Sequence, residues 1–117
     1  MPKRKLDPLP AAAFQILLSL ADENRHGYGI MRQVEEQSGG RMRLGPGTLY
    51  SSIQTLLDEN LIEETSPPRN HDAPNAERRR YYRLTSAGRK LARAEAGRLA
   101  DILRIARARK IFRGEYV

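Results

Sequence analysis

The chain has 117 residues, so a single domain with one hydrophobic core is expected. It contains no cysteine, which excludes disulfides, thiolate metal ligands and cysteine nucleophiles and fits a reducing cytoplasm. The formal net charge is +7, from 21 Lys/Arg and 14 Asp/Glu. A basic chain without an apolar run long enough to cross a bilayer is expected to be cytoplasmic, and to bind nucleic acid rather than a membrane surface.

The positive charge is concentrated near the C-terminal end. Residues 1–77 hold 8 Lys/Arg and 11 Asp/Glu, whereas residues 78–117 hold 13 and 3. The net charge therefore changes from −3 to +10 along the chain. Two interpretations remain open at this point: a surface that binds nucleic acid, or the solvated face of a long helix.

The first predicted helix starts at Asp7-Pro8, an N-cap followed by proline in the first turn, and continues to Ala21. Its side chains are apolar on both faces. A helix that is apolar all round must be covered all round, which one small domain can hardly do. We therefore expect one face to pack on the core and the face with Phe14 and Leu18 to pack on a second copy.

A polar break at residues 22–25 precedes a second predicted helix over residues 27–38. We expect His26 to orient the turn into this helix. Gly39 and Gly40 follow its end, where glycine suits a left-handed cap. The side chains expected to face inward are those of Tyr28, Ile30, Met31 and Val34.

A third helix is predicted after the Gly-Pro-Gly run at 45–47, and Asn60 is expected to end it in a left-handed conformation. No charged residue occurs from position 44 to position 57, which suits a helix that enters a DNA groove but also suits a largely buried helix. Its buried stripe is expected to be Leu49, Ile53, Leu56 and Leu57. The candidate base-reading residues are Thr48, Tyr50, Ser51, Ser52 and Gln54.

Two of these candidates have distinct chemistry. Gln54 carries a side-chain amide, which can pair with an adenine edge in two places. Tyr50 has two possible roles: its hydroxyl donates to a phosphate, or its ring is partly in the core.

A β-hairpin is predicted next, with strands at 61–66 and 78–84 and a proline-rich loop at 67–77 between them. The returning strand begins with three arginines. We expect at least one of them to contact DNA phosphates. The complete set of basic candidates for the DNA backbone is Arg78, Arg79 and Arg80, with Arg41, Arg43 and Lys5.

Thr85 is expected to cap a last helix over residues 86–111, roughly 39 Å long at 1.5 Å per residue. Ala92, Leu99 and Ala106 lie seven residues apart, as in a coiled-coil seam. Too little of the domain lies beside this helix to cover its apolar stripe. The stripe that we expect at a dimer interface comprises Leu91, Leu99, Ile102, Leu103 and Ala106.

The order of these elements predicts a mainly α fold with a two-stranded β-wing: a winged helix-turn-helix followed by a C-terminal dimerisation helix. The third helix would read the major groove and the hairpin would be the wing. The expected division is a DNA-binding domain over residues 1–85 and a dimerisation helix with its tail over residues 86–117.

Four runs of residues stand out along the chain: HGYGI at 26–30, GTLY at 47–50, LLDENLI at 56–62, and RYYRLT at 80–85 with Gly88 three residues later. Together they resemble the PadR family of bacterial transcriptional regulators, over nearly the whole chain. Each run alone is weak, but all four in order are specific. The chain departs from the family pattern at Ser51, where proline is frequent, and at Asn60, where glycine is frequent.

The resemblance implies a homodimeric DNA-binding regulator of the short-tailed branch, often a repressor, released in some members by an aromatic or drug-like ligand near the dimer interface. The sister ArsR and MarR families fit less well. With no cysteine and only His26 and His71 as histidines, no metal site is expected, and no cofactor either.

Other functions remain as alternatives: a winged helix that binds RNA or shapes DNA, or a protein–protein interaction module. Sequence-specific RNA readers stack bases on aromatic side chains, and few are expected to be exposed here. They are Tyr50, one of Tyr81 and Tyr82, and Tyr116. No catalytic triad, phosphate-binding loop or clustered carboxylate pair is present, so an enzyme is not expected.

Overall fold

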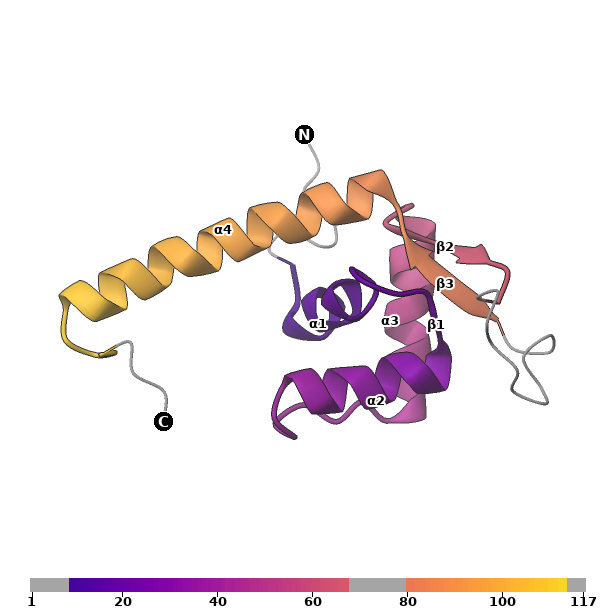
Figure 1. Ribbon diagram of the computed structural model, residues 1–117, viewed down its shortest axis with the longest axis horizontal. Coiled ribbons are helices and arrows are strands. Elements are labelled where there is room, and N and C mark those ends of the chain that lie inside the picture. Colours follow the sequence, from indigo (N-terminus) through magenta and orange to yellow (C-terminus); the bar gives the residue numbers. More distant parts are fainter. Residues whose placement is uncertain (1–8, 68–79, 114–117) are drawn as a thin grey trace.

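The computed structural model describes residues 9–67 and 80–113, which form a helical body, a small sheet and a long last helix (Figure 1). The helices of the body are α1 (Ala11–Ser19), α2 (Gly27–Gln37) and α3 (Pro46–Asp58). The strands are β1 (Arg25–His26), β2 (Ile62–Thr65) and β3 (Tyr81–Leu84), and the last helix is α4 (Ser86–Ala108). The predicted fold class, helices with a β-wing, is confirmed.

One core holds the body together, because each helix presents an apolar stripe at helical spacing to the other two. Its most deeply buried members come from α1, α2, α3 and the start of the wing: Ile16, Leu17, Ile30, Val34, Leu49, Ile53, Leu56, Leu61 and Ile62. Leu57, expected in the same stripe, is only partly buried and packs against this cluster.

Three helix ends follow the sequence expectations. The Nδ1 atom of His26 accepts a hydrogen bond from the backbone N–H of Gly29 at 3.1 Å, so His26 caps α2. Thr85 caps α4 in the same way, with its Oγ1 atom 2.9 Å from the N–H of Gly88. Asn60 adopts a φ of 59°, which ends α3 in the left-handed region.

Other boundaries differ from the expectations. α1 begins after Pro10, and the predicted start at Asp7-Pro8 lies outside the described residues. α4 ends at Ala108 instead of at position 111, so its 23 residues span roughly 34 Å. Both wing strands are shorter than predicted, and Arg80 immediately precedes β3.

The sheet has three strands rather than two, in the order β1-β3-β2 with antiparallel neighbours. β1 was not predicted, because two residues in a polar segment carry no alternating pattern. As the central strand, β3 is paired along both edges. Tyr81 and Tyr82 point to opposite faces of the sheet, yet both are buried, at 1% and 4% exposed. The expectation that one of these tyrosines is exposed is wrong.

Two guanidinium groups hold the C-terminal end of α1. Arg25, on β1, donates from Nε to the carbonyl oxygen of Ser19 at 2.7 Å. Arg89, on α4, donates to the carbonyl oxygen of Ala21 at 3.0 Å. Positive charge at this end of a helix is favourable, since the last carbonyls lack partners inside the helix. The two arginines tie α1 to the sheet and to α4.

The first turn of α4 lies directly against the backbone of residue 61. The N–H of Thr85 donates to the carbonyl oxygen of Leu61 at 3.2 Å. A Cβ atom on Gly88 would overlap with that same oxygen, so only glycine permits this approach. Beyond this first turn α4 runs along α1 and then extends past the rest of the body (Figure 1).

Candidate nucleic-acid interface

α3 has one buried and one exposed face. Gly45 is its N-cap and Pro46 its first residue, a position where the missing N–H of proline costs nothing. Four of the five candidates for base reading are exposed: Thr48, Tyr50, Ser51 and Gln54. The fifth, Ser52, is half-buried at the border of this face. The interpretation of α3 as a largely buried helix is therefore wrong.

The hydroxyl groups on this face use their protons within the helix. Ser51 donates to the carbonyl oxygen of Thr48 at 3.2 Å, and Thr55 donates to that of Ser51 at 3.0 Å. Each hydroxyl oxygen keeps its lone pairs for an outside donor. In this arrangement the hydroxyls of Ser51 and Thr55 face outward as hydrogen-bond acceptors.

The amide of Gln54 has a partner on the same helix. Its Nε2 atom lies 2.8 Å from Oδ1 of Asp58, one turn further along, and both side chains are exposed. Spacing of four residues places the two side chains next to each other on the helix surface. This hydrogen bond favours one position of the Gln54 amide before any ligand binds.

Tyr50 lies over the start of α2. It is 55% exposed and does not pack against the core cluster, which contradicts the interpretation that its ring is partly in the core. A Cβ atom on Gly27 would come within 2.7 Å of the Tyr50 hydroxyl oxygen. The ring therefore lies against the N-terminus of α2, and glycine at position 27 makes room for it.

Tyr28 is exposed as well, at 56%, and the expectation that it faces inward is wrong. It lies in the first turn of α2, on the side of the helix opposite the buried Ile30. Its ring is stacked on that of His26, with centroids 6.4 Å apart and planes within 10°. The guanidinium of Arg32, one turn later, lies 5.9 Å from the ring centroid. The sequence analysis missed this pair, although Tyr28 and Arg32 have the spacing of helical neighbours.

The described arginine candidates differ in their partners. Arg41 is exposed and forms no ion pair within the described part of the chain. Nε of Arg43 lies 3.2 Å from the carboxylate of Glu35, and Nε of Arg80 lies 3.5 Å from that of Glu64. Such exposed pairs are weak, so a phosphate can compete for both guanidinium groups. The remaining candidates lie outside the described residues: Lys5, Arg78 and Arg79.

The root of the wing is built around Tyr82. Burial raises the pKa of this phenol, the nearby carboxylate of Glu64 raises it further, and Arg80 acts in the opposite direction. Tyr50, on α3, also raises it. Tyr82 stays neutral at physiological pH, which allows it to stay in the core beneath the charged wing surface.

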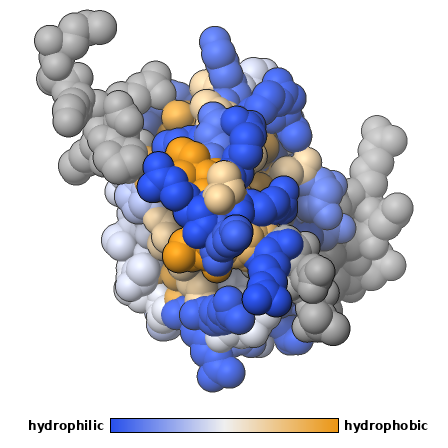
Figure 2. All heavy atoms as spheres, turned by 90° about the vertical axis from the view of Figure 1, so that its left-hand side faces the viewer, coloured by the Kyte–Doolittle hydropathy of each residue, from blue (hydrophilic) through white to orange (hydrophobic). Residues whose placement is uncertain are grey.

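The candidates for a dimer interface lie on α1 and α4. Leu99 is 40% exposed, Ile102 49% and Leu103 40%, and Leu18 on α1 is 38% exposed. Apolar side chains reach the surface between charged ones on the side toward which α4 projects (Figure 2). Phe14, Leu91 and Ala106 are half-buried within the single chain. A second copy would therefore bury more surface on the four exposed side chains than on the three half-buried ones.

One charged pair interrupts this apolar stripe. Glu95, four residues before Leu99, is only 8% exposed. Arg98 donates to both of its carboxylate oxygens, from Nε at 2.8 Å and from a terminal nitrogen at 2.5 Å. This hydrogen bonding lowers the pKa of Glu95 and keeps the carboxylate ionised. The sequence analysis did not identify this pair.

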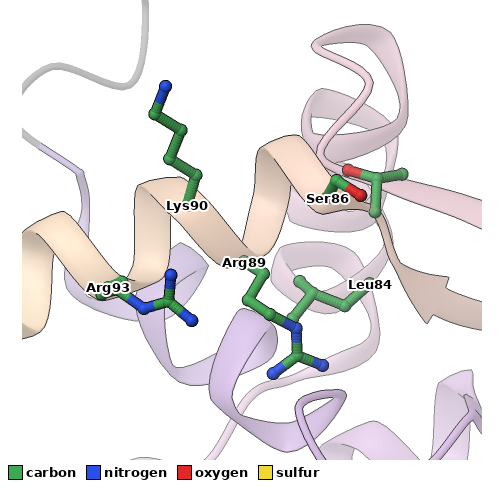
Figure 3. A pocket seen from close by; sticks show the side chains of 6 residues that line it. Leu84, Ser86, Arg89, Lys90 and Arg93 are labelled. Atoms are coloured by element: carbon green, nitrogen blue, oxygen red, sulfur yellow. The ribbon is translucent and has the colours of Figure 1, made fainter.

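A basic hollow lies where β3 passes into α4 (Figure 3). Arg89 and Arg93 point to one side of α4 there, and Lys90 points to the other. The guanidinium of Arg89 is already bound to the carbonyl oxygen of Ala21. The hollow adds positive charge near the body without forming an enclosed site.

No group of three His, Asp or Glu side chains close enough to hold a metal ion occurs in the part of the chain that the structure describes. Over the same residues, none of the helices has the length and hydropathy needed to span a bilayer. The site is therefore described by its hydrogen-bonding groups and charges alone.

Comparison with known families agrees with this geometry. Residues 16–94 match the model of the transcriptional regulator PadR-like family, which covers more than half of the chain. The chain belongs to this family. Its resemblance to PadR regulators in the four runs from residue 26 to residue 88 is thereby confirmed, and the family is one of transcriptional regulators.

Two curated relatives are named as uncharacterized proteins. A protein of a transposon from Streptomyces fradiae is 36% identical over 91 residues, which cover 78% of this chain but 24% of that protein. A protein from Lysinibacillus sphaericus is 28% identical over 74 residues, 63% of this chain and 64% of its own length. This PadR-like chain thus spans about a quarter of the first relative and just under two thirds of the second.

Solved structures share the fold. A PadR family transcription regulator from Clostridium difficile superposes with a TM-score of 0.71 at 22% identity, over 85% of this chain and 97% of that one. RosR from H. salinarum gives 0.58 at 28% identity, over 81% and 74%. Bacillus subtilis PadR, solved in complex with operator DNA, gives 0.58 at 20% identity, over 73% and 46%.

Within this PadR-like fold, the residues chosen from sequence form two separate groups. Those on α3 lie together on one exposed face, with Arg80 at the root of the wing beside it. Those on α1 and α4 lie on the apolar surface toward which α4 projects. Tyr28, Arg32 and Asp58 extend the first group, and none of them was chosen as a site residue from the sequence.

Proposed function

We propose that this PadR-like protein is a homodimeric repressor that binds an inverted-repeat DNA operator through α3 and the wing. In this proposal residues 1–85 form the DNA-binding domain, and residues 86–117 contribute the dimerisation helix. The crystal structure of Bacillus subtilis PadR in complex with operator DNA supports the proposal that this chain binds an operator too.

The exposed face of α3 carries the proposal. Three buried side chains, Leu49, Ile53 and Leu56, fix the helix on the core. Its opposite face offers hydroxyl and amide groups with no charge before Asp58, so α3 can approach base edges without repulsion from phosphates. Arg41 and Arg80 occupy flanking positions in the chain, where contacts to phosphates would fix the register.

The dimer follows from the second group of residues. Leu99, Ile102 and Leu103 are apolar side chains that one chain leaves 40% or more exposed, and a second copy would cover them. A twofold dimer would place two α3 helices about 34–36 Å apart, or a multiple of that distance, on an inverted repeat. A small aromatic effector, implied by the family resemblance, would then bind between the copies, near Phe14 and Leu18.

The test is binding of the purified protein to labelled duplexes, starting with the DNA that flanks its gene, measured by fluorescence anisotropy at several salt concentrations. We expect a specific site bound about 10³-fold or more tighter than random duplex, and an affinity that falls steeply with salt. Ser51→Ala and Gln54→Ala should lower this ratio. An equal affinity for all duplexes, with unchanged ratios in both variants, would contradict the proposal.

An RNA-binding winged helix is the alternative that an observation favours, since Tyr28 and Tyr50 are both more than half exposed. Competition between duplex DNA and single-stranded RNA of the same sequence separates the two functions. We expect duplex to displace the labelled operator and RNA to leave it bound. The opposite result would assign the exposed tyrosines to base stacking.

A further inference from the structure

The hydrogen bond between Gln54 and Asp58 has a direction that chemistry alone fixes. Nε2 of Gln54 lies 2.8 Å from Oδ1 of Asp58. A carboxylate has lone pairs but no proton to give, so only the NH₂ group of the amide can face it. The amide of Gln54 is therefore held in one of its two orientations, with its carbonyl oxygen directed away from Asp58.

This orientation leaves two groups of Gln54 free. They are the carbonyl oxygen, which accepts, and the second N–H, which donates. An adenine edge in the major groove offers the N6 amino group as donor and N7 as acceptor, and an amide pairs with both at once. The NH₂ group has two protons, so it can donate one to Asp58 and the other to N7 of adenine.

The other polar side chains on the exposed face of α3 have fewer hydrogen-bonding groups available for a base. The hydroxyl protons of Ser51 and Thr55 are taken by carbonyl oxygens of α3, and α3 contains no lysine or arginine for the guanine edge. Among the described polar side chains of α3, Gln54 then has a defined donor and a defined acceptor both free to face a base. Its orientation would decide which base pair is preferred.

We propose that Asp58 is a positioning residue that sets the base preference of α3 by holding the Gln54 amide in the orientation that an adenine edge requires. This inference rests on the proposed entry of α3 into the major groove. Fixing a flexible side chain before binding removes the cost of ordering it, which raises the ratio of specific to random affinity. The carboxylate also repels phosphates, which weakens random binding.

Four variants isolate this role. Asp58→Ala removes the acceptor, whereas Asp58→Asn keeps an acceptor oxygen but removes the charge. Glu59→Ala and Glu59→Gln make the same changes at the adjacent acid, which forms no hydrogen bond with Gln54 among the described residues. All four lose one negative charge near the DNA, so their affinity for random duplex should rise alike.

The measurements are selection from a pool of duplexes with a randomised centre, and anisotropy on the selected site and on random duplex. Wild type should select adenine at one position of each half-site, and Gln54→Ala should lose that preference. Asp58→Ala should lower the specific-to-random ratio about two- to tenfold and broaden the same position. Asp58→Asn should retain the wild-type preference, as should both Glu59 variants.

Two results would overturn the inference while leaving the proposed function intact: a full adenine preference in Asp58→Ala, or an Asp58→Asn variant as unselective as Asp58→Ala. In both cases Gln54→Ala would still lose the preference. If Gln54→Ala and Ser51→Ala bind the selected site like wild type, α3 does not read the bases, and the proposed function fails together with this inference.

Discussion

Isoleucine side chains are buried in the body but exposed in the distal half of α4. Ile53, on α3, is 2% exposed because three helices and the sheet enclose it. Ile105, on α4, is 56% exposed because the helix has already left the body at that point. The body therefore completes its own core, whereas α4 carries apolar surface that the chain does not cover. Such surface is typical of a site for another protein.

The largest effect is expected where a charge is placed on the uncovered surface. Leu103→Asp would bury an unpaired carboxylate between two copies, which costs about 3–5 kcal/mol and should dissociate the dimer. Analytical ultracentrifugation would report a monomer, and specific DNA binding should be lost although no residue of α3 has changed.

The control for this variant is Ala94→Asp, which adds the same charge at an exposed position of α4 outside the apolar stripe. It should remain dimeric and bind DNA like wild type. If the Leu103→Asp variant stays dimeric, the two copies contact each other through another surface. The exposed apolar side chains of α4 would then not be the dimer interface.

A second prediction uses the contrast directly. Ile53→Ala should lower the free energy of unfolding by about 2–5 kcal/mol, because it leaves a cavity in a closed core. The same substitution at Ile105 should cost less than about 0.5 kcal/mol in a dissociated Leu103→Asp background. Denaturant titrations of both variants would check this, and equal losses would show that α4 is covered within one chain.

The junction between the regions gives a third prediction. Gly88→Ala would bring a methyl group onto the carbonyl oxygen of Leu61, so α4 must shift away from the body. We expect a loss of about 1–3 kcal/mol in the free energy of unfolding. Gly97→Ala is the control, since nothing lies within 4 Å of a Cβ there, and it should stabilise α4 slightly. If the two variants have the same stability, this close approach does not occur.

The smallest effect concerns charge. Arg80 at the wing and Arg104 on α4 are both exposed, and each has a carboxylate partner. Arg80→Ala should reduce the slope of log affinity against log salt by about 0.9, the value for one lost phosphate contact. Arg104→Ala should leave the slope unchanged. A larger change for Arg104 than for Arg80 would place the DNA on the side of α4.

The elements that repeat a simple pattern were predictable from sequence. Leu49, Ile53 and Leu56 recur at helical spacing, and their burial left the opposite face of α3 exposed as expected. The cap residues His26 and Thr85 were also predictable, because capping depends on a single side chain next to a helix.

Features that depend on contacts distant in sequence were not predictable. β1 is a strand only because Arg25 and His26 pair with Tyr82 and Tyr81, more than fifty residues later. The same pairing makes β3 the central strand and brings the ring of His26 to that of Tyr81, with centroids 5.3 Å apart.

Two local pairs were missed for another reason. Tyr28 is next to the buried Gly27 in sequence, but on the helix it faces the side of Arg32, away from Ile30. Gln54 and Asp58 are also four residues apart on one helix, so their contact could have been predicted from that spacing.

The pairing of β1 with β3 also affects the order in which the protein can form as the ribosome makes it. β1 precedes α2 and α3, but its partner strand is synthesised only after both of these helices and the whole wing loop. Until residue 84 has emerged, the body lacks its central strand, and Arg25 has no sheet to join. The helices can begin to associate early, whereas closure of the sheet must wait for a contact of long sequence separation. β3 and α4 are therefore synthesised one directly after the other. The nascent chain completes its body first, and it then gains the helix through which we expect it to bind a second copy.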